Sequence, residues 1–237
     1  MDQPLISVVI PAYQHAASLP GCLESVFAQQ NVRTEIIVVD DGSTDGTLEV
    51  LEPYKAKGVR VIHQENQGAN PARNRGLAEA TGEYVIVLDA DIIMRPTMLC
   101  DFLAQLQAHP EASYAYGSFY FGWKHFHGVP FSAERLRCMN FVHTSALVRR
   151  ADHPGFDPAI KRFQDWDVWL TMLERGKTGV LVPGTYFLAR IDGKSRIGSS
   201  WLPSFVYRLP WKYVGWKPMR VAKYEAAREA IKQKHKL

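Results

Sequence analysis

The sequence predicts an α/β fold, with a mostly parallel, Rossmann-like sheet covered by helices on both faces. The first observation is that apolar, β-branched runs alternate with segments of helical periodicity over the first 110 residues. The second is that polar residues follow these runs where the strands end, as at the carboxyl edge of a parallel sheet. The third is size, since 237 residues, 46% of them hydrophobic, can form one sizeable core.

Each expected element follows from its own residues. The expected strands are residues 5–10, which end at Pro11; 35–39, which Asp40-Asp41-Gly42 stop; 59–63; 84–88; and 113–121. The expected helices are residues 16–29, with apolar Leu19, Leu23, Val26 and Phe27; 44–57, ending near Gly58; 70–80, closed by Gly82; 96–108, opened by Pro96; 165–175; and 219–236. Residues 122–164 have weak periodicity, and 180–191 contain short strands.

Charge and cysteine usage narrow the class of protein. Residues 205–237 hold nine of the 28 Lys and Arg but two of the 24 Asp and Glu. A nucleic-acid protein more often carries its basic patch on the folded domain, so no nucleic-acid partner is expected. The three cysteines are widely spaced without a metal or disulfide pattern, which indicates a reducing compartment. No signal peptide and no long apolar run is evident, so a cytoplasmic location is expected.

Two carboxylates, Asp89 and Asp91, interrupt the apolar run Val87–Ile93. A buried unpaired carboxylate is costly, so these side chains are expected where a strand ends and water or a cation begins. Carboxylates one residue apart can share Mg²⁺ or Mn²⁺, which completes its shell with phosphate oxygens. The alternative is a solvated turn that caps the helix beginning near Pro96.

The second expected strand also ends in carboxylates, Asp40 and Asp41. The segment Asp41–Gly46 is similar to a calcium-binding loop, but such a loop follows a helix, whereas the preceding residues read as a strand. We therefore expect a turn, with Thr44 or Asp45 capping the next helix. Both carboxylates would then face the crevice outside the strand ends.

The segment Asn66–Gly76 joins a glycine loop to the start of a helix. Pro71 suits the first helical turn. Free backbone N–H groups together with Arg73 would favour an anion. The alternative is an ordinary loop with surface arginines.

The segment Phe163–Leu170 places Asp165 and Asp167 at the start of a helix. Asp165 taken alone is best explained as an N-cap, with Asp167 favoured by the helix dipole. The two tryptophans beside them make an apolar setting, in which a carboxylate can instead be a general base with a pKa tuned by burial.

In combination, these residues resemble the family 2 glycosyltransferases of the GT-A fold. Five segments in order, within residues 5–175, carry the resemblance: Ser7-Val8-Val9-Ile10-Pro11-Ala12-Tyr13; Val38-Val39-Asp40-Asp41-Gly42-Ser43-Thr44-Asp45; Asn66-x-Gly68 with Ala72-Arg73-Asn74-x-Gly76; Gly82-Glu83-Tyr84 through Leu88-Asp89-Ala90-Asp91; and Gln164-Asp165-Trp166-Asp167. Each is modest alone, but five in register are specific.

The resemblance implies an inverting, metal-dependent glycosyltransferase whose donor is a nucleoside diphosphate sugar, UDP-linked. The donor-binding residues it implies are Pro11, Ala12, Tyr13, Asp41, Arg73, Asp89, Ala90 and Asp91. Among them Asp91 would be the principal ligand of Mn²⁺ or Mg²⁺, with Asp89 at the metal or the ribose. Asp165 matches the Asp of the family's Glu-Asp pair, which makes it the expected general base and overturns the cap interpretation.

Two positions depart from the family pattern. Gln164 replaces the usual Glu, so a charge beside the base is missing. Arg190-Ile191-Asp192 stands where relatives often carry a Tyr-Arg-x-His-like segment, so Asp192 or water would complete the metal shell. Lys194 and Arg196 would reach the diphosphate.

The resemblance also divides the chain. Residues 1–110 would be the nucleotide-sugar-binding half, and 111–200 the acceptor-binding and catalytic-base half of the same domain. The acceptor, a glycan or a lipid-linked molecule, would lie over residues 120–165. The aromatic side chains expected to stack on its sugar rings are Trp123, Phe126, Trp166 and Trp169.

Residues 201–237 form a basic, aromatic C-terminal tail. Aromatics interleaved with cations suit the inner face of an anionic membrane, so peripheral contact is one expectation. The other is that the tail packs back onto the catalytic domain.

Two other function classes stay open on the sequence. A non-catalytic module that binds sugar nucleotides or glycans would be consistent with Gln164. A haloacid-dehalogenase-like phosphatase also uses an Asp-x-Asp at a strand end, but there the motif usually opens the domain instead of closing its fourth strand.

Overall fold

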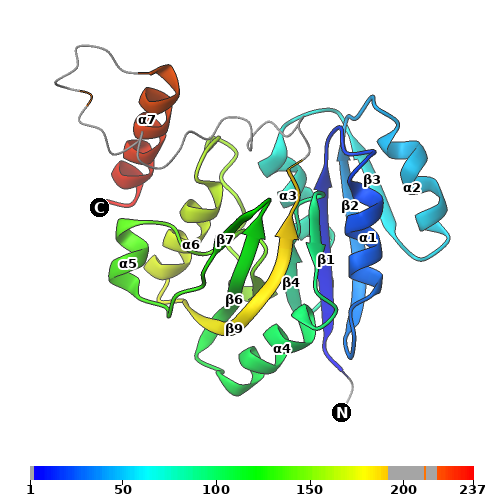
Figure 1. The fold of residues 1–237 in the computed structure, drawn as a ribbon, viewed down its shortest axis with the longest axis horizontal. Helices are drawn as coiled ribbons and strands as arrows, with labels where there is room; N and C mark the ends of the chain where they lie inside the picture. Colours follow the sequence, from blue (N-terminus) through cyan, green and yellow to red (C-terminus); the bar gives the residue numbers. More distant parts are fainter. Residues whose placement is uncertain (1–2, 192–210, 212–217) are drawn as a thin grey trace.

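The computed structural model describes residues 3–191, 211 and 218–237. Within them a nine-stranded sheet has the order β3-β2-β1-β4-β8-β6-β9-β5, and β7 pairs with β6 (Figure 1). The strands are β1 Leu5–Ala12, β2 Arg33–Asp41, β3 Arg60–Gln64, β4 Tyr84–Val87, β5 Ile92–Met94, β6 Ala112–Phe121, β7 Lys124–Phe126, β8 Leu147–Arg149 and β9 Thr178–Ala189. The helices are α1 Leu19–Phe27, α2 Thr47–Lys55, α3 Ala69–Glu79, α4 Met98–Ala108, α5 Ala133–Cys138, the 3₁₀ helix η1 Arg150–Asp152, α6 Gln164–Glu174 and α7 Met219–Lys234.

The amino-terminal half of the sheet is parallel. Strands β1 and β2, β2 and β3, and β1 and β4 all pair in parallel, so the carboxyl ends of four strands share one edge. Strands β6 and β9 are also parallel, whereas β5, β7 and β8 join antiparallel to their neighbours. The predicted α/β class with a mostly parallel sheet in its amino-terminal half is confirmed.

Alternation along the strands assigns each helix to a face. Ile6, Val8 and Ile10 of β1 pack in one cluster with residues of α1, α2 and α4. Val9 of β1 packs in a second cluster with residues of α3, α5, α6 and α7. Because successive side chains of a strand point to opposite faces, the two clusters are the two sides of one sheet. Helices therefore cover both faces, as predicted.

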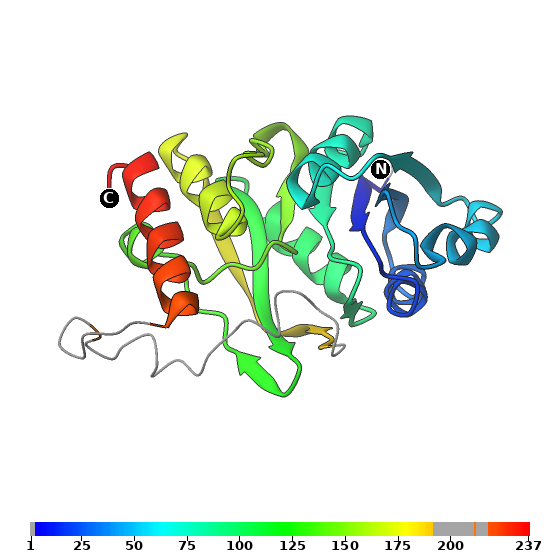
Figure 2. The same cartoon turned by 90° about the horizontal axis from the view of Figure 1, so that it is seen from above.

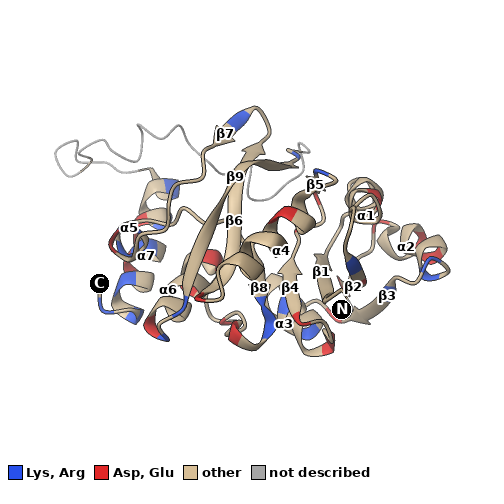
Figure 3. Ribbon diagram, turned by 90° about the horizontal axis from the view of Figure 1, so that it is seen from below, with Lys and Arg blue, Asp and Glu red and all other residues tan. Residues whose placement is uncertain are grey.

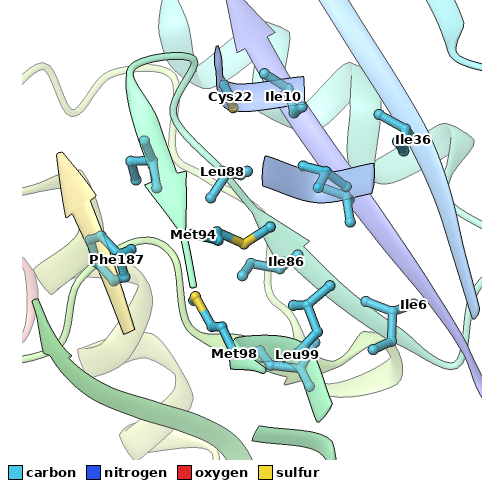
Figure 4. Close-up of a cluster of buried hydrophobic side chains, with 14 of the residues drawn as sticks. Ile6, Ile10, Cys22, Ile36, Ile86, Leu88, Met94, Met98, Leu99 and Phe187 are labelled. Carbon is cyan, nitrogen blue, oxygen red and sulfur yellow. The ribbon is translucent and has the colours of Figure 1, made fainter. Parts of the chain in front are cut away.

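The first cluster forms the core beneath α1 and α4. Figure 4 shows Ile6 and Ile86 from the parallel strands near Met98 and Leu99 of α4, with Ile10 farther along β1. All five of these side chains are fully buried. Each apolar side chain of this size contributes roughly 1.5–3 kcal/mol when it leaves water, so this layer holds the strand ends in fixed positions.

The second cluster is anchored by two tryptophans of α6. Trp166 and Trp169 are buried, and their indole N–H groups donate to the backbone carbonyls of Leu136 (2.6 Å) and Val142 (2.9 Å). The indoles thus supply apolar area and satisfy their own polar atoms. As a result, α6, α5 and the segment after α5 form one unit against the sheet.

Helix α7 lies beside α6, as Figures 1 and 2 both show. Ile231 is buried in the second cluster, and the Tyr224 ring meets the Phe163 ring edge-on at 5.1 Å. His235, just after the helix, bonds the Asp167 carboxylate at 2.9 Å. This part of the predicted tail therefore packs back onto the domain. Residues 201–210 and 212–217 of that tail lie outside the described residues.

The charges of α7 differ in their surroundings. Lys234 pairs with Asp157 and Asp167, both at 2.8 Å, whereas Lys223 and Lys236 are exposed. Figure 3 marks Lys and Arg positions in blue along this helix, at one end of the molecule. Within the described ranges, no helix combines the length and apolarity that a membrane crossing needs.

Five short elements were not predicted: β5, β7, β8, α5 and η1. Three of them are three-residue strands, too short for an alternating pattern to appear, and their pairing depends on distant partners. The expectation of short strands in 180–191 was wrong, because β9 is one strand of 12 residues. It stays continuous because β6 pairs with it along its whole length, with three register shifts.

Gly76 provides a test of the contact between α3 and the sheet. A Cβ on Gly76 would lie 2.3 Å from Val9 Cγ1 and 3.3 Å from Val39 Cγ2. Although Ala is the better helix former by roughly 1 kcal/mol, overpacking a filled site costs about 1–3 kcal/mol. We expect Gly76→Ala to lower the free energy of unfolding in urea. Ala78→Ser, at an exposed position of the same helix, should stay within about 0.5 kcal/mol, and a stabilised Gly76→Ala would contradict this packing.

Candidate functional site

The predicted donor-binding residues occupy the shared edge of the parallel strands. Pro11 and Ala12 end β1, Asp41 ends β2, and Asp89 follows β4 by two residues. Ala12 lies directly opposite Asp40 in the register of β1 and β2. Their common location is the one expected of a ligand crevice in a parallel sheet.

The loops after β1 and β2 bind each other. The backbone N–H of Gln14 donates to Ser43 Oγ (3.0 Å), that of His15 to Thr47 Oγ1 (3.0 Å), and that of Ala16 to Asp45 Oδ2 (3.1 Å). The N-cap position of α2 is Gly46, in a left-handed conformation, and not Thr44 or Asp45, but Asp45 Oδ1 accepts from the N–H of Thr47 (3.1 Å), the first residue of the helix. Ser43, Thr47 and the second oxygen of Asp45 bind the loop after β1, which fixes the segment that carries Tyr13.

Asp41 holds the glycine loop. Its Oδ1 accepts from Gln64 Nε2 (2.8 Å) and the Gln67 N–H (2.9 Å), and its Oδ2 accepts from the Gly68 N–H (2.8 Å). The expectation that backbone N–H groups of this loop are free for an anion was therefore wrong for residues 67 and 68. Asp41 is 2% exposed, and its carboxylate already accepts hydrogen bonds from these two N–H groups.

Arg73 and Asp89 form the central ion pair. Arg73 Nη2 lies 2.9 Å from Asp89 Oδ1, and Nη1 donates to Asn70 Oδ1 (3.0 Å). Arg73 is buried, and its guanidinium lies 5.1 Å from the centre of the Phe156 ring. Burial opposes ionisation of Asp89, but the Arg73 guanidinium outweighs it and holds the pKa of Asp89 below its ordinary value. This carboxylate is therefore ionised at neutral pH.

Asn70 and Asn74 connect α3 to the loop before α6. Asn70 Nδ2 donates to the carbonyls of Asp157 (2.8 Å) and Ile160 (3.0 Å), and Asn74 exchanges two hydrogen bonds with the backbone of Phe156. The helix that carries Arg73 is thereby fixed against the segment that leads to Asp165.

The turn from Asp89 to Asp91 is held by backbone contacts. The Asp89 carbonyl accepts from the Ile92 N–H, and the Asp91 carbonyl accepts from the Arg190 N–H, both at 3.0 Å. Ala90 between them is buried, and both Asp side chains are half-buried. Two carboxylates are thus presented on one short turn at the strand ends.

The donor set of this turn fits a hard divalent cation. Among the residues that the structure describes, no cluster of three or more His, Cys, Asp and Glu side chains forms a metal site. Mg²⁺ and related ions keep several waters and bind proteins through one or two carboxylates plus substrate phosphates. Asp91, with Asp89 Oδ2, matches that requirement in number and chemistry.

Asp165 lies in the same site, on the first turn of α6. It is half-buried, its Oδ1 accepts from the Trp166 N–H (2.9 Å), and its Oδ2 accepts from Asn140 Nδ2 (2.6 Å). Burial raises the pKa of Asp165 to about 6, and the nearby Asp89 charge adds to this while Arg73 opposes it. Phe163, at the N-cap position, makes no side-chain cap. The arrangement suits a carboxyl group that exchanges a proton near neutral pH.

Sequence reasoning missed two polar residues of this site, Asn140 and His143. His143 is near enough to Asp89 and Arg73 for their charges to affect it, and burial lowers the pKa of its ring to about 4. Its Nδ1 accepts from the Ser145 N–H (3.1 Å), so the neutral ring carries its proton on Nε2. No spacing in the sequence connects residues 140–143 to 89 or 165, so a pattern search could not have found them.

The expected aromatic acceptor platform is reduced to one side chain that is open to solvent. Trp166 and Trp169 were predicted to stack on sugar rings, but both are 1% exposed, so this prediction was wrong. Phe126 stacks instead on Phe119, at 4.9 Å between ring centres. Trp123, by contrast, is 90% exposed at the turn between β6 and β7.

The positions that depart from the family pattern are only partly described. Gln164 begins α6 and is half-buried, and Arg190 follows β9. Asp192, Lys194 and Arg196 lie outside the described residues, so the expected completion of the metal shell and the contacts to a diphosphate stay predictions.

Comparison with known proteins agrees with this geometry. The family described as Glycosyl transferase family 2 matches residues 7–161. "Glycosyltransferase GlyG" of Streptococcus pneumoniae is 40% identical over 119 residues, which are 49% of this chain and 39% of that protein. A "PGL/p-HBAD biosynthesis glycosyltransferase" of Mycobacterium tuberculosis is 33% identical over 180 residues, which are 70% of this chain and 69% of that protein. The match thus covers well under half of the length of GlyG.

Solved structures match the fold. The structure of TarS residues 1–349 from S. aureus in complex with UDP-GlcNAc has a TM-score of 0.68 at 20% identity, over 86% of this chain and 63% of that chain. The mannosyltransferase PcManGT from Pyrobaculum calidifontis, in complex with GDP-Man and Mn²⁺, has a TM-score of 0.65 at 18% identity, over 84% and 61%. The predicted GT-A architecture is confirmed by these likenesses.

Proposed function

The chain belongs to glycosyl transferase family 2 and is a glycosyltransferase, and from this premise we propose that it moves a sugar from a nucleoside diphosphate sugar to an acceptor hydroxyl with inversion. The observation that carries the proposal is the position of Asp165. A carboxyl group with a pKa raised towards neutrality lies in one site with the Arg73–Asp89 pair, at the edge where ligands of parallel sheets bind. The family match argues against the phosphatase, and a candidate base in the site argues against the non-catalytic module.

The donor is bound at the ends of β1, β2 and β4. In this proposal Pro11, Ala12, Tyr13 and Asp41 surround the nucleoside, and Arg73 supplies positive charge to the diphosphate. A carboxylate has about four lone-pair sites, and three of those of Asp41 are taken by Gln64 of β3 and the N–H groups of Gln67 and Gly68. The remaining one suits the single ring N–H of uracil better than the two donors of guanine, which supports a UDP-sugar.

A divalent cation, Mn²⁺ or Mg²⁺, is held by Asp91 and Asp89. When bound, it neutralises the charge that develops on the departing diphosphate. The S. aureus and P. calidifontis structures contain UDP-GlcNAc, and GDP-Man with Mn²⁺, respectively, which supports both the donor class and the ion. Backbone hydrogen bonds hold the turn, and Arg73 orients the carboxylate of Asp89.

Asp165 takes the proton of the acceptor hydroxyl as that oxygen attacks the anomeric carbon from the face opposite the diphosphate. A base of pKa about 6 is ionised in most molecules at pH 7 and is still basic enough to accept a proton. The acceptor lies over residues 120–165, with Trp123 available to a sugar ring. We propose a glycan or a lipid-linked acceptor and a cytoplasmic location.

Asp165→Asn tests the base. The amide has nearly the same shape but cannot accept the proton, so turnover should fall about 10²–10⁴-fold while donor binding is retained. Release of UDP from UDP-glucose, UDP-galactose and UDP-GlcNAc with Mn²⁺ measures turnover, and thermal shift with UDP measures binding. Asp167→Asn is not a suitable control, because Asp167 anchors Lys234 and His235. The control is Asp101→Asn, which makes the same chemical change on α4. Undiminished UDP release from Asp165→Asn would refute the assignment.

Asp91→Asn tests the metal ligand. A ligand at about 100 times its Kd stabilises a protein by about 2.7 kcal/mol. Mn²⁺ should strengthen UDP binding and therefore increase the thermal stabilisation of the unsubstituted chain by UDP. In Asp91→Asn we expect the Mn²⁺-dependent part of the shift to disappear and the part due to UDP alone to remain. Glu52→Gln, at an exposed carboxylate of α2, should leave both parts intact. A normal Mn²⁺ response of Asp91→Asn would exclude Asp91 as the ligand.

Peripheral membrane contact through residues 201–237 stays part of the proposal. Removing the whole tail is a poor test, because Ile231 and His235 are buried against α6. We expect the double variant Lys223→Glu and Lys236→Glu to bind vesicles of phosphatidylserine and phosphatidylcholine less well than the unsubstituted chain, in co-sedimentation at low salt. The control, Lys55→Glu with Lys57→Glu, changes net charge equally at α2. Equal losses of vesicle binding in both double variants, or binding that does not depend on lipid charge, would refute membrane contact through the tail.

A further inference from the structure

Asn140 makes a directed hydrogen bond to the carboxylate of Asp165. Asn140 Nδ2 lies 2.6 Å from Asp165 Oδ2. The orientation of the amide follows from its other contact, because Asn140 Oδ1 accepts from the backbone N–H of Val142 (3.2 Å). Since Oδ1 is occupied by a donor, the NH₂ group is the one that faces the carboxylate.

The segment around Asn140 is fixed by the helix that carries Asp165. Trp166 Nε1 holds the carbonyl of Leu136 on one side of Asn140, and Trp169 Nε1 holds the carbonyl of Val142 on the other. Both indoles are buried, so these bonds are shielded from water. Asn140 and Asp165 are therefore parts of one packed unit, although 25 residues separate them.

The two oxygens of Asp165 are each held by one donor. Oδ1 accepts from the Trp166 N–H and Oδ2 accepts from Asn140. Each oxygen keeps a lone-pair site, so a hydroxyl group can still approach the fixed carboxylate. The charged groups that act on Asp165 from other elements are Arg73 on α3 and Asp89 after β4. Asn140 differs from both because it contributes a donor without a charge.

We propose that Asn140 is a positioning residue of the transfer reaction, whose amide fixes the plane of the Asp165 carboxylate and favours its ionised form. The inference rests on the proposed function, in which Asp165 accepts the proton of the acceptor. A hydrogen bond donated to the ionised form stabilises that form selectively. Gln164 is neutral, so the residue directly before Asp165 adds no charge, and the groups that favour the ionised form are the Trp166 N–H, Arg73 and, in this proposal, Asn140.

The test measures the ionisation of Asp165 directly and then its consequence. With aspartate labelled by ¹³C at the carboxyl carbon, the Asp165 resonance is the one that Asp165→Asn lacks. We expect Asn140→Leu to raise the pKa of Asp165 by about one unit, and Asn140→Asp to raise it further, since two carboxylates at this distance share a proton. The pH of half-maximal UDP release should rise by the same amount, so that release at pH 6 falls about fivefold in Asn140→Leu.

The control is Gln29→Leu, just after α1, which removes an amide that bonds the backbone of Ser25, Arg95 and Leu99 on the face of the sheet opposite α6. It should leave the Asp165 pKa unchanged even if the chain loses stability. Asn140→Asp keeps the size of the side chain, so it remains informative if Asn140→Leu folds poorly. An unchanged Asp165 pKa in both Asn140 variants, with UDP release lowered equally at every pH, would overturn the inference. Activity of Asp165→Asn would instead overturn the proposed function.

Discussion

The Arg73–Asp89 ion pair is the constraint on which the site depends. Arg73 is almost fully buried, and a buried guanidinium without a partner costs several kcal/mol, so Asp89 and Asn70 must stay within reach of it. Through Asn70 the same network reaches the carbonyls of Asp157 and Ile160. The carboxyl edge of the parallel strands and the loop that leads to α6 are thereby set relative to each other.

Helix α6 extends that constraint to the second half of the chain. Its first turn carries Asp165 towards the Arg73 network, while Trp166 and Trp169 face the sheet and secure the segment that contains Asn140. The buried carboxylate of Asp167 points to the other side, where Lys234 and His235 of the C-terminal region bind it. Charges and indoles on three sides of one helix thus determine where the candidate base lies.

The two carboxylates of the site differ because their partners differ. Asp89 faces a cation and stays ionised, whereas Asp165 has neutral donors and a longer-range interaction with Arg73, so burial dominates and its pKa rises. One site therefore contains a carboxyl group that is ionised at neutral pH and another that can exchange a proton near neutrality. Separate environments for similar residues are how a protein assigns acid–base roles.

Local sequence determined the parallel half of this protein. The strands ending at Pro11 and Asp41, the run before Asp89 and the amphipathic helices between them are short-range patterns, and parallel pairing then puts their polar ends at one edge. The family resemblance supplied Asp165 from the same kind of local motif. Only the tertiary structure decided that Trp166 and Trp169 are buried anchors and not a sugar platform, that Asp41 occupies the N–H groups of the glycine loop, and that Asn140 and His143 join the site. These facts depend on contacts between residues far apart in the chain, and neither periodicity nor spacing encodes which distant backbone carbonyl an indole will bind or which carboxylate an amide will meet.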